Sequence, residues 1–106
     1  MNMGLKKKVT VAGAGSWGTA LAMVLADNGH DVRLWGNDAA QIEEINQTHM
    51  NEKYLSDIEL PKAIVGYTNL ADALDDVDTV ILAVPTKAIR EVVQKINAQA
   101  KQPLTV

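Results

Sequence analysis

The stretch that decides the fold reads Val9-Thr10-Val11-Ala12-Gly13-Ala14-Gly15-Ser16-Trp17-Gly18. Its first four residues are apolar or β-branched and end at a glycine, which predicts a short strand buried on both faces. The glycines then follow the pattern G-x-G-x-x-G and open a segment with helical spacing. Such a pattern arises often by chance, but between a buried strand and a helix it predicts a loop that holds the pyrophosphate of a dinucleotide.

Each glycine of this loop has a separate expected role. Gly13 permits the tight turn, Gly15 lets the backbone approach the pyrophosphate, and Gly18 brings the helix close to the strand. The N–H groups of Ser16, Trp17 and Gly18 lie at the helix N-terminus, where the helix dipole favours an anion. The alternative interpretation is a tight strand-to-helix turn without a ligand.

Strands and helices alternate along the rest of the chain. Strands are predicted at 9–12, 31–35, 63–67 and 79–84, and the last of these, the most apolar run, is expected to be central. The first predicted helix starts at Trp17 and has Leu21, Val24 and Leu25 on its apolar face. The second runs from Asp38, its N-cap, to about Thr48, and a short third helix runs from Thr68 or Asn69 to Leu74. A fourth helix follows Thr86 as its cap, and its apolar face contains Ile89, Val92, Val93 and Ile96. Residues 50–62 have no clear periodicity and are expected to form a connection.

This alternation predicts the α/β class and a Rossmann-type, doubly wound parallel sheet in three layers, α/β/α. Leu104-Thr105-Val106 resembles the beginning of a fifth strand, so the sequence is expected to be a fragment, truncated in or just after that strand. Residues 1–106 are accordingly expected to form one dinucleotide-binding domain.

The composition limits the possible functions. The chain has 106 residues, of which 47% are hydrophobic, as in ordinary soluble globular domains. A net charge of −3 argues against a protein that works by coating nucleic acid. The absence of cysteine excludes disulfides and thiolate metal sites and fits a cytoplasmic protein. Neither a membrane span nor a signal peptide is expected.

The end of the second strand should select between NAD and NADP. An NAD enzyme usually places a carboxylate there, whereas this chain has Asn37, and Asp38 is expected to cap a helix. Asn37 can bind either form of the ribose or serve only as a turn residue. No arginine replaces the acid in the loop, and alternation along the strand can point Arg33 elsewhere.

Val84 and Pro85 end the fourth strand, beside the point where strand order reverses. They are expected to border the nicotinamide side of the cofactor, although Pro85 can equally serve only to end the strand. His30, His49 and Lys87 are interpreted as structural or solvated residues, and so is the acidic turn of Asp75, Asp76 and Asp78. The sequence therefore predicts no catalytic residue and no metal ligand.

A more specific signal comes from segments beyond the loop. Residues 13–22, 25–30 and 32–36, followed by 44–46, 51–55, 60–61 and 82–85, resemble the bacterial glycerol-3-phosphate dehydrogenases that use NAD(P)+. The resemblance covers nearly the whole chain from about Lys8. Two positions depart from the family: Asn37 is often basic there, and Ser56-Asp57 replaces the usual Pro-Gly.

The resemblance implies an enzyme that interconverts dihydroxyacetone phosphate and sn-glycerol 3-phosphate with NAD(P)H and supplies phospholipid synthesis in the cytoplasm. It implies that Ser16 and Trp17 contact the cofactor phosphates, that Asn37 lies at the adenosine ribose, and that Tyr54 lies along the cofactor. A helical C-terminal domain with most of the substrate site is absent from this sequence, and the full-length protein is expected to be a homodimer.

The sequence permits alternatives for the cofactor and for the activity. The cofactor can be NADP or NAD, with a slight preference for NADP because no carboxylate repels a 2′-phosphate. Another dehydrogenase on the same fold, acting on a 2-hydroxy or keto acid, is an alternative. A non-catalytic module that senses the NAD(P)H ratio is a second one.

Overall fold

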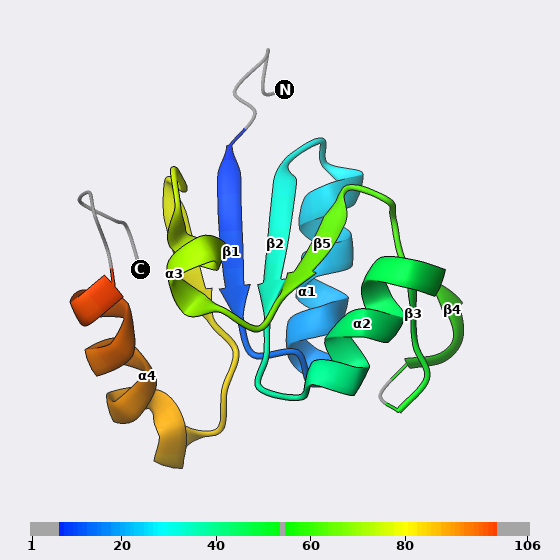
Figure 1. Ribbon diagram of the computed structural model, residues 1–106. Coiled ribbons are helices and arrows are strands. Elements are labelled where there is room, and N and C mark those ends of the chain that lie inside the picture. The colour runs from blue at the N-terminus through cyan, green and yellow to red at the C-terminus, as the bar shows by residue number, and fades with distance from the viewer. Residues whose placement is uncertain (1–6, 54, 100–106) are drawn as a thin grey trace.

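The computed structural model describes residues 7–53 and 55–99. Within them the chain forms, in order, β1 (Lys8–Ala12), α1 (Ser16–Asp27), β2 (Asp31–Trp35), α2 (Ala39–Thr48), β3 (Met50–Asn51), β4 (Leu55–Glu59), β5 (Ile64–Tyr67), α3 (Leu70–Leu74), β6 (Thr79–Leu82) and α4 (Thr86–Gln99) (Figure 1). The predicted strand at 104–106 lies outside the described residues, and so does Tyr54.

Four strands form one parallel sheet in the order β5-β2-β1-β6. β1 lies in the middle because its run from Val9 to Ala12 is buried on both faces, as predicted. It pairs with β2 through Val11 and Leu34 and with β6 through Val11 and Ile81. Strand order reverses between β1 and β6, so the predicted Rossmann-type sheet is confirmed and its switch point lies at their carboxyl ends.

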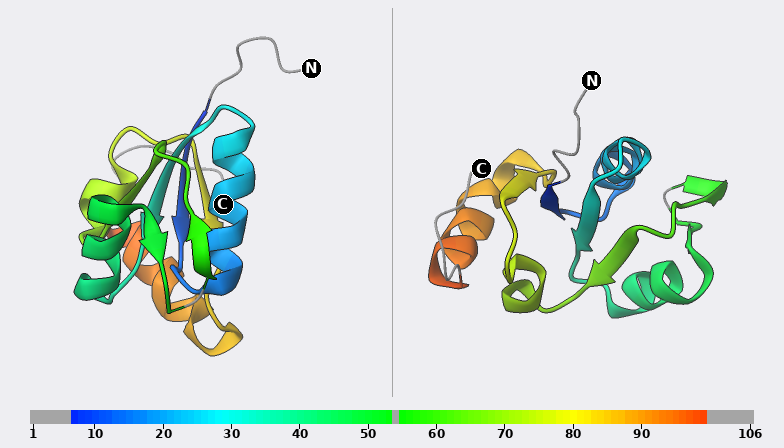
Figure 2. Two further views of the ribbon diagram at one scale, coloured as in Figure 1. Left: turned by 90° about the vertical axis from the view of Figure 1, so that its right-hand side faces the viewer. Right: turned by 90° about the horizontal axis from the view of Figure 1, so that it is seen from above.

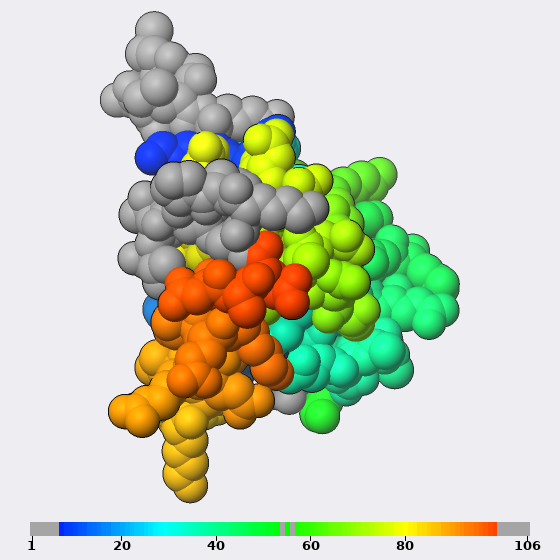
Figure 3. Space-filling view, turned by 60° about the vertical axis from the view of Figure 1, so that its left-hand side comes forward, coloured from blue at the N-terminus to red at the C-terminus, as the bar shows by residue number. Residues whose placement is uncertain are grey.

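Helices cover both faces of this sheet, which confirms the three-layer architecture. One buried cluster joins Val11, Val32 and Leu34 of the sheet to residues of α1 and α2. The other joins Ala12 and Trp35 to residues of α3 and α4. Seen from above, α1 lies on one side of the sheet and α3 and α4 on the other (Figure 2). The latter two helices lie side by side on the molecular surface (Figure 3).

The buried face of α1 matches the predicted one only in part, because Leu25 packs against the core as expected but other predicted residues do not. Trp17 is 67% exposed and Val24 is 55% exposed, whereas Gly18, Thr19 and Ala22 are buried. Small side chains on the inner face let the helix axis come close to the sheet, so Trp17 and Val24 lie further out. A similar shift occurs in α4, where two of the four predicted apolar residues, Val92 and Ile96, are buried; Val93 is half-buried and Ile89 is exposed.

The expected connection at 50–62 is wrong, because it contains the two antiparallel strands β3 and β4. β3 has only two residues and the pairing is irregular, so no alternating pattern marks the strands in the sequence. The strand predicted at 79–84 ends at Leu82. The next predicted strand, at 104–106, lies outside the described residues, so a central position for β6 stays a prediction. Among the described residues it pairs with β1 alone and forms the edge of the sheet.

Helix caps follow the sequence in two of three places. Asp38 caps α2 by accepting hydrogen bonds from the Ala40 and Gln41 N–H groups, at 3.1 and 3.2 Å. Asn69 rather than Thr68 caps α3. Thr86 is the first residue of α4 rather than its cap, and the carbonyl of Pro85 accepts from the N–H of Ala88. None of the helices described here is both long and apolar enough to cross a membrane.

Candidate functional site

A cavity of about 670 Å³ opens at the carboxyl ends of β1, β2 and β6. The loop between β1 and α1 forms its floor, the end of β2 and the start of α2 form one wall, and the segment from β6 into α4 forms the other. The lining residues are 13–17, 35–38, 41, 83–85, 88 and 92. The cavity therefore contains seven of the nine residues predicted as a cofactor site: Gly13, Gly15, Ser16, Trp17, Asn37, Val84 and Pro85.

The three glycines of the loop are required for different reasons. Gly13 has φ +126°, and a Cβ there would stand 2.3 Å from the carbonyl oxygen of Ala83. Gly18 lies outside the cavity, but a Cβ on it would meet the Gly13 carbonyl oxygen at 1.8 Å, so it permits the contact between α1 and the loop. A Cβ on Gly15 would meet no protein atom within 4 Å. Packing thus explains the first two glycines, whereas the space in front of Gly15 belongs to the cavity.

The N-terminus of α1 opens at this loop. Gly15 is the N-cap residue and has no side chain with which to cap the first turn. The first turn contains no acidic residue. The N–H groups of Ser16 and Trp17 therefore present the positive end of the helix dipole without a side-chain carboxylate, an arrangement that suits an anionic group.

Buried polar side chains hold this loop from behind. The carbonyl oxygen of Ala14 accepts hydrogen bonds from Gln41 Nε2 at 2.5 Å, from Thr19 Oγ1 at 3.3 Å and from Asn51 Nδ2 at 3.3 Å. Asn51 also donates to Thr19 Oγ1 at 2.9 Å and accepts from Gln41 Nε2 at 3.1 Å. Thr19 and Asn51 are completely buried. Four separate segments, the loop, α1, α2 and β3, are joined in this way.

Sequence reasoning missed this group of residues. Gln41 and Asn51 stand in segments that were interpreted as a narrow apolar stripe and an irregular connection. One signal was available: Gln41 lies four residues before Ile45, which places its amide on the buried face of α2. No comparable spacing marks Asn51, because β3 is too short to show a period.

The end of β2 places Asn37 and Asp38 differently. Asn37 is exposed and lines the cavity, where its amide remains available to a ligand. One carboxylate oxygen of Asp38 accepts from two N–H groups of α2, so this acid serves as the predicted helix cap. Trp35 supplies the apolar wall beside them; it is buried, and its indole N–H donates to the Thr68 carbonyl at 3.0 Å.

Arg33 points away from the cavity, which confirms what alternation along β2 suggested. Its Nη1 atom donates to the carbonyl oxygens of Asp72 and Asp75 at the end of α3. The guanidinium also lies over the ring of Tyr67, 5.6 Å from the ring centre. Arg33 therefore stabilises the packing of α3 and cannot reach a ribose phosphate at the carboxyl end of the sheet.

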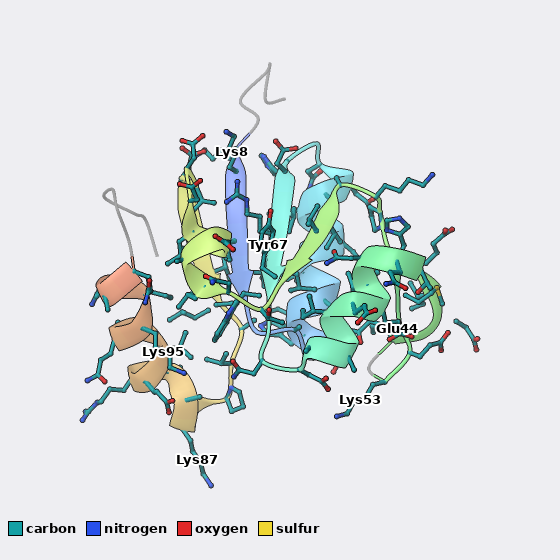
Figure 4. All side chains as sticks on the ribbon, viewed as in Figure 1. Lys8, Glu44, Lys53, Tyr67, Lys87 and Lys95 are labelled. Carbon is teal, nitrogen blue, oxygen red and sulfur yellow. The ribbon has the colours of Figure 1, made fainter. Side chains whose placement is uncertain are left out.

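The remaining candidates lie outside the cavity. The Nδ1 atom of His30 accepts from the Lys7 N–H at 3.1 Å, at the opposite end of the sheet. His49 is the C-cap residue that follows α2, in a left-handed conformation, and does not line the cavity. Lys87 is exposed on the first turn of α4 and points away from the protein body (Figure 4).

The acidic turn before β6 binds the N-terminal end of β1. Asp76 forms an exposed ion pair with Lys8, with 2.6 Å between Oδ2 and Nζ, and Asp78 accepts from the Lys8 N–H at 3.0 Å. The hydrogen bond and the charge of Lys8 lower the pKa of Asp76, and the same contact raises the pKa of Lys8. These groups stand at the end of β1 opposite the cavity (Figure 4).

The sequence of this chain matches the family described as NAD-dependent glycerol-3-phosphate dehydrogenase N-terminus over residues 8–106. The chain belongs to this family. It is 59% identical over 98 residues to a glycerol-3-phosphate dehydrogenase [NAD(P)+] of Bacillus cereus, and 58% identical over 100 residues to that of Geobacillus thermodenitrificans. These alignments cover 92% and 94% of this chain but only 29% of each relative.

The fold agrees with this family. The crystal structure of a glycerol-3-phosphate dehydrogenase from Coxiella burnetii matches 93% of this chain with a TM-score of 0.86 at 33% identity. The matched part is 30% of that protein. The chain thus corresponds to the NAD-binding part of a glycerol-3-phosphate dehydrogenase and spans about a third of the length of its relatives. The resemblance inferred from the sequence is confirmed.

Proposed function

We propose that the cavity binds NAD or NADP, with the cofactor pyrophosphate on the loop from Gly13 to Gly18. The observation that supports this most directly is the open space in front of Gly15, at an uncapped helix N-terminus. A Cβ there would touch no protein atom, so the missing side chain leaves room for a ligand. An anionic pyrophosphate fits both that space and the dipole of α1.

Each lining residue has a proposed position along the cofactor. The N–H groups of Ser16 and Trp17 bind the phosphate oxygens, and the amide of Asn37 binds the adenosine ribose. Val84 and Pro85, across the switch point, border the nicotinamide side. Tyr54, outside the described residues, is proposed to lie along the cofactor.

The charges around Asn37 permit both cofactors. Arg33 is held at α3 and does not bind a 2′-phosphate. Asp38 caps α2 through Oδ1, and its carboxylate keeps its negative charge beside Asn37. The amide of Asn37 is neutral and can donate to a hydroxyl or to a phosphate. We therefore keep NAD and NADP as equal proposals.

The chain is proposed to be the cofactor-binding part of an enzyme that interconverts dihydroxyacetone phosphate and sn-glycerol 3-phosphate, with phospholipid synthesis as its cellular role. When bound, the nicotinamide supplies the hydride of that reaction. The described residues of this chain orient the cofactor, and Asp38, the carboxylate among the lining residues, is engaged as the cap of α2. Family membership favours this function over the 2-hydroxy acid dehydrogenase and the redox-sensing module.

A titration with NADPH and then NADH tests the proposal. Trp17 is exposed and lines the cavity, whereas Trp35 is 4% exposed, so quenching of the emission should come mainly from Trp17. A Trp17→Phe variant assigns the signal. A Gly15→Val variant that still folds should lose the response, because its side chain fills the space proposed for the pyrophosphate. A folded wild-type chain that binds neither cofactor by calorimetry would contradict the proposal.

A second measurement tests whether the reaction needs residues outside this chain. The chain alone is expected to bind cofactor weakly and not to oxidise NADPH with dihydroxyacetone phosphate. Steady-state turnover by this chain would show that its own residues suffice for the chemistry.

A further inference from the structure

We propose that Thr19, Gln41 and Asn51 are positioning residues for the pyrophosphate loop. They fix the peptide between Ala14 and Gly15 so that its N–H is presented to the cofactor. This inference rests on the proposed function, because it needs an anion at the loop. None of the three was expected to have a role from the sequence.

Ala14 lies among several buried side-chain donors. Its carbonyl oxygen is approached by three side chains from three elements, α1, α2 and β3. Both hydrogens of the Gln41 amide are used, one on Ala14 and one on Asn51 Oδ1. Both hydrogens of the Asn51 amide are used as well, on Ala14 and on Thr19 Oγ1. Gln41 makes the shortest of the three contacts with the Ala14 oxygen, at 2.5 Å, and Thr19 and Asn51 approach it at 3.3 Å, so the carbonyl group is held in one orientation from three sides.

The planar peptide between Ala14 and Gly15 determines where the Gly15 N–H points. No cis peptide bond occurs among the described residues, so the C=O of Ala14 and the N–H of Gly15 point in opposite directions. With the carbonyl held by the buried amides, the Gly15 N–H faces away from them, on the part of the loop that lines the cavity. It joins the N–H groups of Ser16 and Trp17 as a third donor for an anion.

The buried hydrogen bonds around Ala14 also keep the loop rigid. A buried polar group with an unmet hydrogen bond is costly, so a rotation of this peptide would break several buried hydrogen bonds at once. The loop thus enters the complex already in its binding conformation, and binding does not have to order it. A site that depends on backbone N–H groups gains its affinity from such preorganisation.

A matched pair of variants separates this role from simple stability. Thr19→Val removes the hydroxyl that links Ala14 and Asn51. Thr10→Val is the control, because Thr10 is equally buried and donates to the carbonyl of Ala73, on the α3 side and away from the loop. Urea unfolding of both variants should show similar losses of stability. Thr19→Ser keeps the hydroxyl and serves as the rescue.

The probe is ADP, which carries the pyrophosphate without the nicotinamide. We expect Thr19→Val to raise the Kd of ADP about five- to tenfold, the range that one lost hydrogen bond commonly gives. Thr10→Val should change it less than about twofold, and Thr19→Ser should restore it. If Thr19→Val does not fold, Gln41→Met removes two donated hydrogen bonds at the cavity wall and should give the same rise.

The outcomes separate the two proposals. Equal ADP affinities in the Thr19→Val and Thr10→Val proteins, or for Gln41→Met and the wild type, would overturn the positioning role while the proposed function stands. A wild-type chain that does not bind ADP at all would instead overturn the proposed function.

Discussion

Gly15 and Gly18 are three residues apart, yet alanine should have opposite consequences at the two positions. In Gly18→Ala, the new Cβ would stand 1.8 Å from the Gly13 carbonyl oxygen, well inside the 3.0 Å that real Cβ atoms keep. The obstacle is backbone, so α1 and the loop must separate by about 1 Å in a close-packed interior. Overpacking of this kind costs about 1–3 kcal/mol in the free energy of unfolding.

For Gly15→Ala the structure predicts little loss of stability. Its φ of −74° suits any residue, and the Cβ would enter open space. Alanine stabilises the fold by reducing the entropy of the unfolded chain, but it destabilises the helix because it is a poorer N-cap than glycine. Each effect on the free energy of unfolding is of the order of 1 kcal/mol or less. The methyl group does occupy the proposed pyrophosphate position, so the Kd of NADH should rise about tenfold or more, which corresponds to roughly 1.4 kcal/mol.

The assay combines urea unfolding, followed by circular dichroism, with calorimetric titration of NADH on the same samples. For a domain of this size, each 1 kcal/mol lowers Tm by about 4–8 °C, so the Gly18 variant should be distinguishable by melting alone. A Gly15→Ala protein that is as destabilised as Gly18→Ala, or that binds NADH as the wild type does, would refute this reasoning.

Three further predictions concern other parts of the chain. Asn37→Asp should weaken NADPH binding relative to NADH by about tenfold, because a carboxylate repels the 2′-phosphate, and Asn37→Arg should do the reverse; fluorescence titrations giving one ratio for all three proteins would contradict the assignment. Asp38→Ala should lower the free energy of unfolding by about 1 kcal/mol in urea, whereas Asp38→Asn keeps the cap; equal midpoints for the two variants would count against it. The pKa of Asp76 is lowered by the hydrogen bond and charge of Lys8, so its stabilising effect is present above the ordinary aspartate pKa of about 3.9 and is lost as the pH falls through the lower folded value. The Lys8–Asp76 pair is exposed, so this effect should be small and salt-sensitive. As the pH is lowered from 6 to 2, the Tm of Asp76→Asn should fall slightly less steeply than that of the wild type. Identical curves of Tm against pH would exclude a role for the pair.

The parallel sheet and the glycine loop could be predicted because their signals are local. A run such as Val9 to Ala12 has few other stable arrangements, and the glycine spacing follows it directly. The buried face of α1 could not be predicted from apolar size, because close approach to the sheet selects Thr19 and Ala22 over Trp17. Helical periodicity reports which residues share a face, but not which face the sheet will accept.

The polar group behind the loop escaped prediction for a different reason. Gln41 and Asn51 reach Ala14 from positions 27 and 37 residues away in the chain, so no short motif contains their contacts. The β3–β4 hairpin that carries Asn51 is short and irregular, and its pairing is set by tertiary contacts. Contacts between such distant positions can be recognised only in the folded structure.

The position of β6 beside β1 has a consequence for the order of folding. Thr10 pairs with Val80, 70 residues later, whereas β1 and β2 are joined by a single helix. Contacts of long sequence separation form slowly, so the segment from β1 to β5 can assemble before the second wall of the cavity arrives. The complete cavity exists only after β6 has joined β1, and a dinucleotide spanning both walls would bind only the finished state. Cofactor should accordingly slow unfolding and raise Tm with its concentration, without accelerating the earlier steps.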